Sequence, residues 1–116
     1  MKRGEIYWAQ LTPRSGSEQQ QGRRPVIVVS HDGFNQNVSW RSVIVVPVST
    51  AAAQAQRGPT AVALTQGAGG LNRPSLAICH QVITLDRTKL TQQIGLLDAH
   101  QLAQVDKGLK AALQLS

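Results

Sequence analysis

Short hydrophobic runs rich in β-branched residues recur over the first 85 positions and predict a mainly β protein. Residues 4–11 (GEIYWAQL) predict a strand with Ile6 and Trp8 on one side and Tyr7 and Ala9 on the other, whereas residues 25–30 (PVIVVS) and 42–49 (SVIVVPVS) are almost continuously apolar. Continuous β-branched runs are typical of strands buried on both faces, so we expect these two inside a small barrel or at a subunit contact. Residues 60–64 (TAVAL) predict a short strand and residues 75–85 (SLAICHQVITL) a long one.

The last apolar pattern has the period of a helix and covers residues 98–115 (DAHQLAQVDKGLKAALQL). Apolar residues spaced three or four apart form one stripe along it: Leu102, Val105, Leu109 and Leu113. Asp98 suits the N-cap, where its side chain can accept a hydrogen bond from a free backbone N–H. Gly108 should weaken the helix slightly because glycine gains the most freedom on unfolding.

Polar and glycine-rich segments connect these elements. Residues 12–24 hold Pro, Gly, Ser and three consecutive Gln, and predict a long loop. Residues 31–41 predict a loop or a single helical turn, and residues 51–60 a second polar loop. Residues 66–74 (QGAGGLNRP) have turn chemistry, and residues 86–90 predict a turn or a short helix. The expected fold is a small, mostly antiparallel barrel or strongly bent sheet with a closing helix.

Charge points to a polyanionic partner. The 116 residues, which we expect to form one domain spanning residues 1–116, carry 12 Lys and Arg against 6 Asp and Glu, a net charge of +6. Such an excess on one small domain favours nucleic acid. Aromatic residues are few, so a stacking platform of the RRM kind is not expected. Cys79 is the only cysteine, and no apolar signal core or membrane-length run occurs, so we expect a soluble cytoplasmic protein.

Metal chemistry is not expected. The six acidic residues are dispersed, without the close carboxylate pair of a metal-dependent nuclease: Glu5, Glu18, Asp32, Asp86, Asp98 and Asp106. The three histidines are equally scattered, at positions 31, 80 and 100, and no CxxC or phosphate-cradling GxxxxGK motif occurs. We therefore expect neither a metal nor another cofactor.

RNA offers a reaction that needs no metal, because its 2′-OH can attack the adjacent phosphate when a group removes the proton and cations stabilise the transition state. Arg24 lies where the 12–24 loop meets an apolar strand, and Pro25 fixes the backbone after it. Ser49 and Thr50 supply hydroxyls at the end of another apolar strand. The alternatives are a solvated arginine at a strand start, and hydroxyls that belong to a turn or a cap.

Taken together, these segments resemble the MazF/PemK/Kid family of toxin endoribonucleases from toxin–antitoxin systems. RGEIYWAQLTP is similar to the family's opening strand, and GSEQ with the following GRRPVIVVS to its most characteristic stretch. VIVVPVST resembles the strand whose end carries an active-site hydroxyl. SLAICHQVITLDRTKL and the later IGLL resemble the penultimate strand and the turn into the final helix. The likeness covers nearly the whole chain in the expected order.

The resemblance implies an SH3-like barrel with a C-terminal helix, working as a homodimer. It also implies sequence-specific, metal-independent cleavage of single-stranded RNA that leaves a 2′,3′-cyclic phosphate and a 5′-hydroxyl. Arg24 matches the family's catalytic arginine, and Ser49 its active hydroxyl, with Thr50 as the competitor. Glu18 matches the acid of GSEQ that helps shape the site. The implied partners are RNA and an acidic antitoxin, with DNA contacted only through the antitoxin complex and no membrane.

Six further residues are candidates for RNA contacts, and most have a structural alternative: Gln19, Arg23, Trp40, Arg41, His80 and Gln81. His80 could contact RNA or shuttle a proton, or be a partly buried or dimer-contact histidine. Gln81 could read a base edge or face the core. Trp40 and Arg41 could hold a flipped base and a phosphate, or be a packed tryptophan beside a surface arginine. Three further arginines are expected to be solvated or to line the RNA path: Arg57, Arg73 and Arg87.

Three departures from the family pattern qualify the resemblance. The GSEQ loop is longer by one glutamine, which could shift Glu18 relative to Arg24, and Ser49 replaces the more usual threonine. His80 stands where relatives often carry an acid, and Ile78 where one branch has a working arginine, so that branch's charged pair does not carry over. On a strand these two residues should share a face. A non-catalytic module that binds nucleic acid or an antitoxin is the alternative function.

Overall fold

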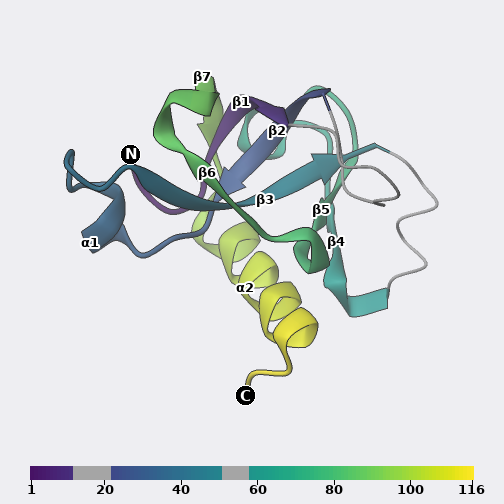
Figure 1. Ribbon diagram of the computed structural model, residues 1–116. Helices are drawn as coiled ribbons and strands as arrows, with labels where there is room; N and C mark the ends of the chain where they lie inside the picture. The colour runs from purple at the N-terminus through teal and green to yellow at the C-terminus, as the bar shows by residue number, and fades with distance from the viewer. Residues whose placement is uncertain (12–21, 51–57) are drawn as a thin grey trace.

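A computed structural model describes residues 1–11, 22–50 and 58–116 of the chain (Figure 1). Over these residues it has seven strands, β1 (Glu5–Leu11), β2 (Gly22–Val28), β3 (Ser42–Ser49), β4 (Ala61–Leu64), β5 (Ser75–Ile78), β6 (Ile83–Asp86) and β7 (Leu90–Leu96). The α-helices are α1 (Asp32–Asn35) and α2 (Ala99–Leu113), and short 3₁₀ turns are η2 (Ala68–Gly70), η3 (Cys79–Gln81) and η4 (Arg87–Lys89).

All strand pairs are antiparallel, in the order β4-β5-β3-β2-β1-β7, with β6 also paired to β3. Strand β3 is the centre of the sheet, because β2 lies along one side and β6 and β5 follow one another along the other. Figure 1 shows α2 lying across one side of this bent sheet. The expected mainly antiparallel β fold with a C-terminal helix is confirmed.

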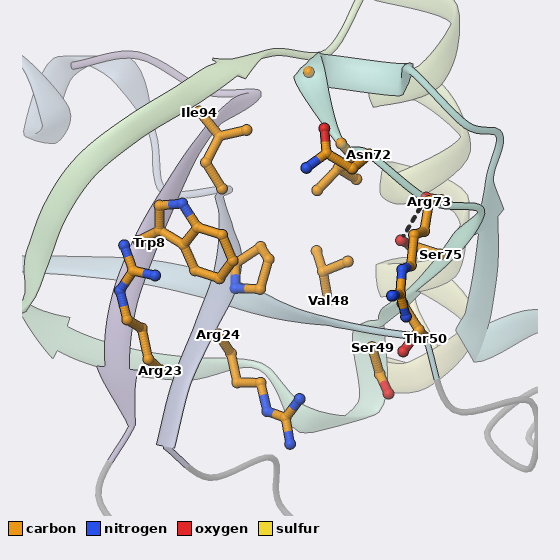
Figure 2. Close-up of a pocket in the computed structure, with 13 residues that line it drawn as sticks. Trp8, Arg23, Arg24, Val48, Ser49, Thr50, Asn72, Arg73, Ser75 and Ile94 are labelled. Carbon is orange, nitrogen blue, oxygen red and sulfur yellow. Dashed lines mark hydrogen bonds between the residues drawn. The ribbon is translucent and has the colours of Figure 1, made fainter.

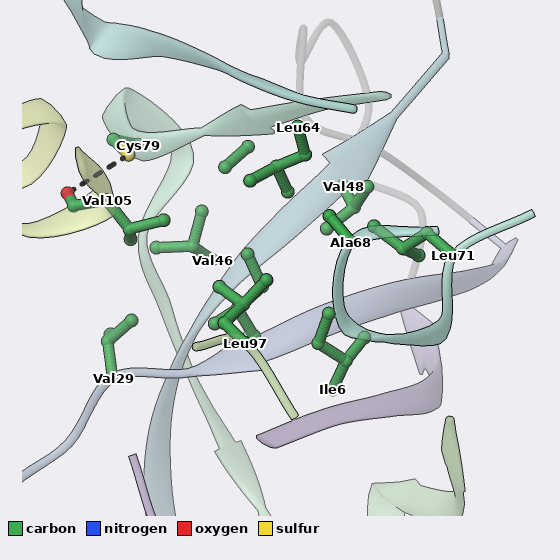
Figure 3. Close-up of a cluster of buried hydrophobic side chains, with 12 residues drawn as sticks. Ile6, Val29, Val46, Val48, Leu64, Ala68, Leu71, Cys79, Leu97 and Val105 are labelled. Atoms are coloured by element: carbon green, nitrogen blue, oxygen red, sulfur yellow. Dashed lines mark hydrogen bonds between the residues drawn. The ribbon is translucent and has the colours of Figure 1, made fainter. Parts of the chain in front are cut away.

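The apolar residues 26–29, in β2 and just after it, and 43–48, in β3, are buried on both faces, as predicted, except that Ile44 is 40 % exposed. Alternate side chains enter two separate clusters. The first gathers Ile27 and Val46 with Val105 of α2 (Figure 3). The second gathers Val26 and Val45 on the opposite face. Each fully buried Val or Ile stabilises the fold by roughly 1.5–3 kcal/mol, so these two strands anchor both layers.

The predicted long strand over residues 75–85 is wrong, since η3 divides it into β5 and β6. β5 pairs with the end of β3 and β6 with its beginning. The chain must step sideways between the two pairings, and it does so in η3, where Cys79 and Gln81 are buried. Ile78 and His80 therefore do not lie two apart on one strand, and the expectation that they share a strand face is wrong as well.

Strand β7 has no counterpart among the predicted strands. Its sequence, LTQQIGL, is polar, and three consecutive residues from Thr91 to Gln93 are exposed. It pairs with β1 through a register that shifts twice. Among the described strands β7 is the last in the sheet order and pairs only with β1, so it needs little burial and neither continuous nor alternating hydrophobicity marks it.

Helix α2 begins as predicted, with Asp98 at the N-cap accepting a hydrogen bond from the Gln101 N–H in a capping box. Val105 of the predicted stripe is fully buried, but Leu113 at the last turn is 52 % exposed. The single turn α1 also matches one of the two predicted alternatives for residues 31–41. No described helix is long and apolar enough to cross a membrane.

Gly108 is required by packing rather than merely tolerated. A Cβ at this position would lie 2.5 Å from Val62 Cγ2 and 2.7 Å from Cys79 Sγ. The missing side chain lets α2 settle directly onto η3 and β4. Burial raises the pKa of the Cys79 thiol to about 12, so this cysteine is a small core residue, as its apolar neighbours in the sequence predict.

The start of the chain is tied to α2 through Arg3. The Arg3 Nη2 donates to Asp106 Oδ1 at 2.6 Å, and its Nε donates to the Val29 carbonyl at 2.9 Å. The Arg3 backbone N–H donates to Asp32 Oδ1 at 2.7 Å, which lowers the pKa of that carboxyl. Arg3 thus joins three segments that lie far apart in the sequence.

Candidate functional site

A pocket of about 350 Å³ opens where β2 begins and β3 ends. Figure 2 shows its walls: β1 and β2 on one side, and the segment from η2 to the start of β5 on the other. The lining residues are Trp8, Arg23, Arg24, Pro25, Val48, Ser49, Thr50, Gly70, Leu71, Asn72, Arg73, Ser75 and Ile94. Of the predicted site residues, the pocket brings together Arg23, Arg24, Ser49 and Thr50.

The register of β2 and β3 explains why Arg24 and Ser49 meet. Val26 pairs with Pro47, and Ile27 with Val46. Continuing that register two residues further sets Arg24 opposite Ser49, and directly opposed residues project from the same face of a sheet. Figure 2 shows both side chains extending toward the same part of the pocket. Arg24 is exposed, whereas Ser49 is only 4 % exposed.

Thr50 follows Ser49 directly and also lines the pocket. It is exposed and lies just beyond the last residue of β3. Ser49 is held within the strand by its pairing with Leu76 of β5. The backbone of Ser49 is therefore fixed by the sheet, which favours its hydroxyl over that of Thr50 as the group that must keep a defined position.

Arg23 lies against Trp8. The Arg23 guanidinium carbon is 4.1 Å from the centre of the Trp8 ring. Trp8 pairs with Pro25, and Gln10 pairs with Arg23, so Arg23 and Trp8 are diagonal neighbours across the two strands. The contact orients the guanidinium and exposes two flat groups, one charged and one aromatic, to the pocket.

The opposite wall comes from the glycine-rich segment before β5. Gly69 and Gly70 both have positive φ, at 57° and 85°. A Cβ on Gly95 of β7 would lie 2.2 Å from the Gly69 carbonyl oxygen, so the turn packs directly on the β7 backbone. This close approach carries Asn72 and Arg73 to the pocket. The predicted turn chemistry of residues 66–74 thus builds a wall of the site.

Sequence reasoning missed Trp8, Asn72 and Ile94 as pocket residues. Arg73, expected to be solvated or to line the RNA path, is exposed and lines the pocket, and its carbonyl accepts a hydrogen bond of 2.9 Å from the Ser75 hydroxyl. No local motif marks these residues, because they come from three separate segments. The sequence offered one indication: Trp8 lies two residues from Ile6 in the predicted first strand, so the two side chains should project from the same face.

The pocket is electropositive. Three guanidinium groups line it, those of Arg23, Arg24 and Arg73, and none of its described lining residues is acidic. Clustered cations on low-dielectric walls attract phosphate groups. Within the described residues no three His, Cys, Asp or Glu side chains are grouped to hold a metal ion.

Trp40 and Arg41 lie far from this pocket. They precede Ser42, at the opposite end of the eight-residue β3 from Ser49, a separation of roughly 24 Å along the strand. The Trp40 ring stacks on Phe34 at 4.8 Å, and Arg41 Nη2 lies 3.3 Å from Asp86 Oδ1. The Thr88 backbone N–H, with Arg41 adding to it, lowers the pKa of Asp86. RNA contacts by Trp40 and Arg41 stay a prediction, at a separate place.

Two more predicted site residues within the described part of the chain, His80 and Gln81, are also absent from the pocket lining. His80 is half-buried in η3, and Gln81 beside it is 4 % exposed. Glu18 and Gln19, like Arg57, lie outside the described residues, so their roles stay predictions. Arg87 is not a solvated surface residue, because its guanidinium donates to the carbonyls of Phe34, Asn35, Asn37 and Trp40. It holds the α1 turn in place.

Comparisons with known proteins agree with this arrangement. Residues 2–113 match the family described as PemK-like, MazF-like toxin of type II toxin-antitoxin system. The endoribonuclease EndoA of Bacillus subtilis is 36 % identical over 115 residues, covering 99 % of this chain and 96 % of the relative.

Solved structures show the same fold. The crystal structure of MazF (Form-I) from Deinococcus radiodurans superposes with a TM-score of 0.78 at 26 % identity, covering 99 % of this chain and 97 % of that one. The MazE–MazF structure (Form-III) from the same organism gives a TM-score of 0.73 at 25 % identity, covering 100 % and 98 %.

Proposed function

The chain belongs to the PemK-like, MazF-like family of type II toxin–antitoxin toxins, and from this premise we propose how its pocket cleaves RNA. It acts as an endoribonuclease, the activity that the name of its Bacillus subtilis relative states for that protein, and we propose single-stranded RNA as the substrate. The observation that carries the proposal is that Arg24, at the start of β2, and Ser49, at the end of the neighbouring β3, line one pocket with two further arginines.

The proposed reaction is an attack by the 2′-oxygen on the adjacent phosphorus. The bond from phosphorus to the 5′-oxygen breaks, the 2′-proton leaves to a base, and the 5′-oxygen takes up a proton. A 2′,3′-cyclic phosphate and a 5′-hydroxyl remain. Arg24 supplies a planar guanidinium whose fork matches two phosphate oxygens and stabilises the charge of the transition state.

Ser49 acts as the positioned hydroxyl in this proposal. A hydroxyl both donates and accepts a hydrogen bond, so it can orient the 2′-OH against the phosphate that Arg24 holds. The positive charge required by the transition state comes from the protein's own guanidinium groups, and we therefore propose that no metal ion takes part. Glu18 remains the acidic candidate of the predicted site.

The partner of this toxin is a cognate antitoxin, as expected for its family, and a MazE–MazF complex is known for a relative of the same fold. We propose that the antitoxin presents an acidic segment, because the protein carries a net charge of +6 and the pocket is lined by three arginines. A homodimer and a sequence-specific cleavage motif also belong to the proposal.

The first test removes metal ions. We expect the purified protein to cut a long single-stranded RNA in excess EDTA as fast as without it, leaving fragments with 5′-hydroxyl ends. These ends accept phosphate from a polynucleotide kinase without prior dephosphorylation, which distinguishes them from 5′-phosphates. Cleavage that stops in EDTA would contradict the metal-free mechanism. Intact RNA that still binds the protein would instead favour the non-catalytic module.

The second test separates the two hydroxyls. Ser49→Ala should lower the cleavage rate by about 10²-fold, the usual effect of losing one group that acts in the transition state. Ser49→Thr should keep most activity, because it retains the hydroxyl. Thr50→Val, matched in shape, should change the rate less than Ser49→Ala. The reverse order in single-turnover assays would make Thr50 the active hydroxyl.

A further inference from the structure

We propose that Asn72 reads the edge of a nucleobase seated beside the Arg24–Ser49 pair, and so helps to set the sequence preference of cleavage. The inference rests on the proposed function, since it presumes that RNA occupies the pocket. Figure 2 shows the Asn72 carboxamide pointing across the pocket, toward the side formed by Trp8 and Ile94. Asn72 is the only side-chain amide among the described residues that line the pocket.

The pocket has the shape and walls that a base requires. Its volume of about 350 Å³ lies near the lower end of the roughly 300–1,000 Å³ usual for small-molecule sites, a size suited to one nucleotide. The stacked Trp8 and Arg23 supply planar groups, and RNA bases stack on both aromatic rings and guanidinium planes. Ile94 and Leu71 add apolar surface. A base stacked here would present its edge to the wall that carries Asn72.

The amide of Asn72 is available for such a contact. Asn72 is exposed, and across the described residues no group hydrogen-bonds to its carboxamide. A carboxamide has two N–H donors and one carbonyl acceptor. It can therefore form two parallel hydrogen bonds with the edge of a base, the arrangement that discriminates best between bases.

The wall that carries Asn72 is held rigidly. The Gly67 N–H donates to the Leu71 carbonyl at 2.8 Å, closing the turn just before Asn72. Gly70, at φ 85°, lies so close to β7 that a Cβ would stand 2.7 Å from the Ile94 carbonyl oxygen. On the other side, the Ser75 hydroxyl binds the Arg73 carbonyl. A reading group on so fixed a backbone can select a base without losing much freedom on binding.

Arg24 and Asn72 would then have different roles, one in the rate of cleavage and the other in the choice of the cleaved sequence. The guanidinium of Arg24 contacts phosphate, which every nucleotide carries, so it supplies rate and affinity without selecting a sequence. Asn72 contacts the base, which differs between nucleotides. Loss of Asn72 should therefore change where the RNA is cut, whereas loss of Arg24 should change how fast every site is cut.

The test compares cleavage profiles of Asn72 variants on an RNA library randomised around the cut. Asn72→Asp keeps the shape but leaves only acceptors. A carboxylate can accept from both N–H groups on the Watson–Crick edge of guanine, so guanine should gain about tenfold relative to the wild-type preference at one position of the motif. Asn72→Ala should flatten the preference at that same position. Exposed Gln114 offers a matched control, and Gln114→Glu should leave the profile unchanged.

The outcomes separate this inference from the proposed function. A change confined to one position, shared by both Asn72 variants and absent in the control, supports the assignment. Wild-type cleavage with identical profiles in all variants overturns the role of Asn72 and leaves the proposed function standing. No cleavage by folded wild-type protein overturns the proposed function itself. Circular dichroism of each variant shows that it is folded.

Discussion

Replacing Arg24 by alanine should lower the rate of RNA cleavage by about 10²–10³-fold, the usual effect of removing one donor that stabilises transition-state charge. Arg24 is exposed at the start of β2, so the fold should survive the change. The loss should appear in kcat more than in KM, because Arg23 and Arg73 still line the pocket and attract the RNA.

Single-turnover kinetics on one RNA with a single cleavage site would measure this effect. Arg24→Lys keeps the charge but loses the fork that binds two phosphate oxygens, and should recover only part of the rate. Lys107 is exposed on α2, away from the pocket, so Lys107→Ala removes the same charge as a control and should cleave at the wild-type rate. Equal activity in wild type and Arg24→Ala would refute the mechanism.

Replacing Gly95 by alanine should lower the free energy of unfolding by about 3 kcal/mol, the upper end of the usual cost of overpacking. The new Cβ would stand 2.2 Å from the Gly69 carbonyl oxygen and 2.7 Å from the Gly69 carbonyl carbon. Both are backbone atoms that cannot turn aside, so the turn over residues 67–71 must move away from β7. Since that turn carries Asn72 and Arg73, cleavage should also fall.

Urea unfolding followed by circular dichroism would measure the stability change. Gly33→Ala is a suitable control, because the atom nearest to its new Cβ is a side-chain ring atom of exposed His31, Nδ1 at 3.0 Å, rather than backbone, and alanine suits a helix better than glycine. Its stability should stay within about 1 kcal/mol of wild type. Wild-type stability of Gly95→Ala would show that the turn does not depend on close packing against β7.

Elements with a strong hydrophobic pattern were predictable from the sequence. The β-branched runs of β2 and β3 and the helical stripe of α2 each follow from burial. Edge strand β7 was not predictable, because its pairing with β1 does not depend on its own hydrophobicity. The break at η3 was hidden because apolar runs flank His80 and Gln81 on both sides and together resemble one strand, although two different stretches of β3 pair with them.

The residues of the candidate site also fall into two groups, those that the sequence indicated and those that it did not. Arg24 and Ser49 could be found because each lies at the end of an apolar strand, and the family pattern associates them. Asn72 and Ile94 could not be, since their place depends on a backbone contact between Gly69 and Gly95, which lie 26 positions apart. Conversely, Trp40 looked suitable for base stacking by type alone, and the structure places it at the far end of β3.

The ion pair between Arg3 and Asp106 has a consequence for synthesis of the toxin. Strand β1 pairs with β2 on one side and with β7 on the other. Arg3 binds the carboxylate of Asp106, which lies 103 positions later in the sequence. A ribosome adds roughly 5–20 residues per second, so several seconds pass between the synthesis of β1 and the synthesis of β7. Trp8 on that strand and Ile94 on β7 both line the pocket. The pocket can therefore assemble only after β7 has been made, even though Trp8 and the strand ends that carry Arg24 and Ser49 are present long before.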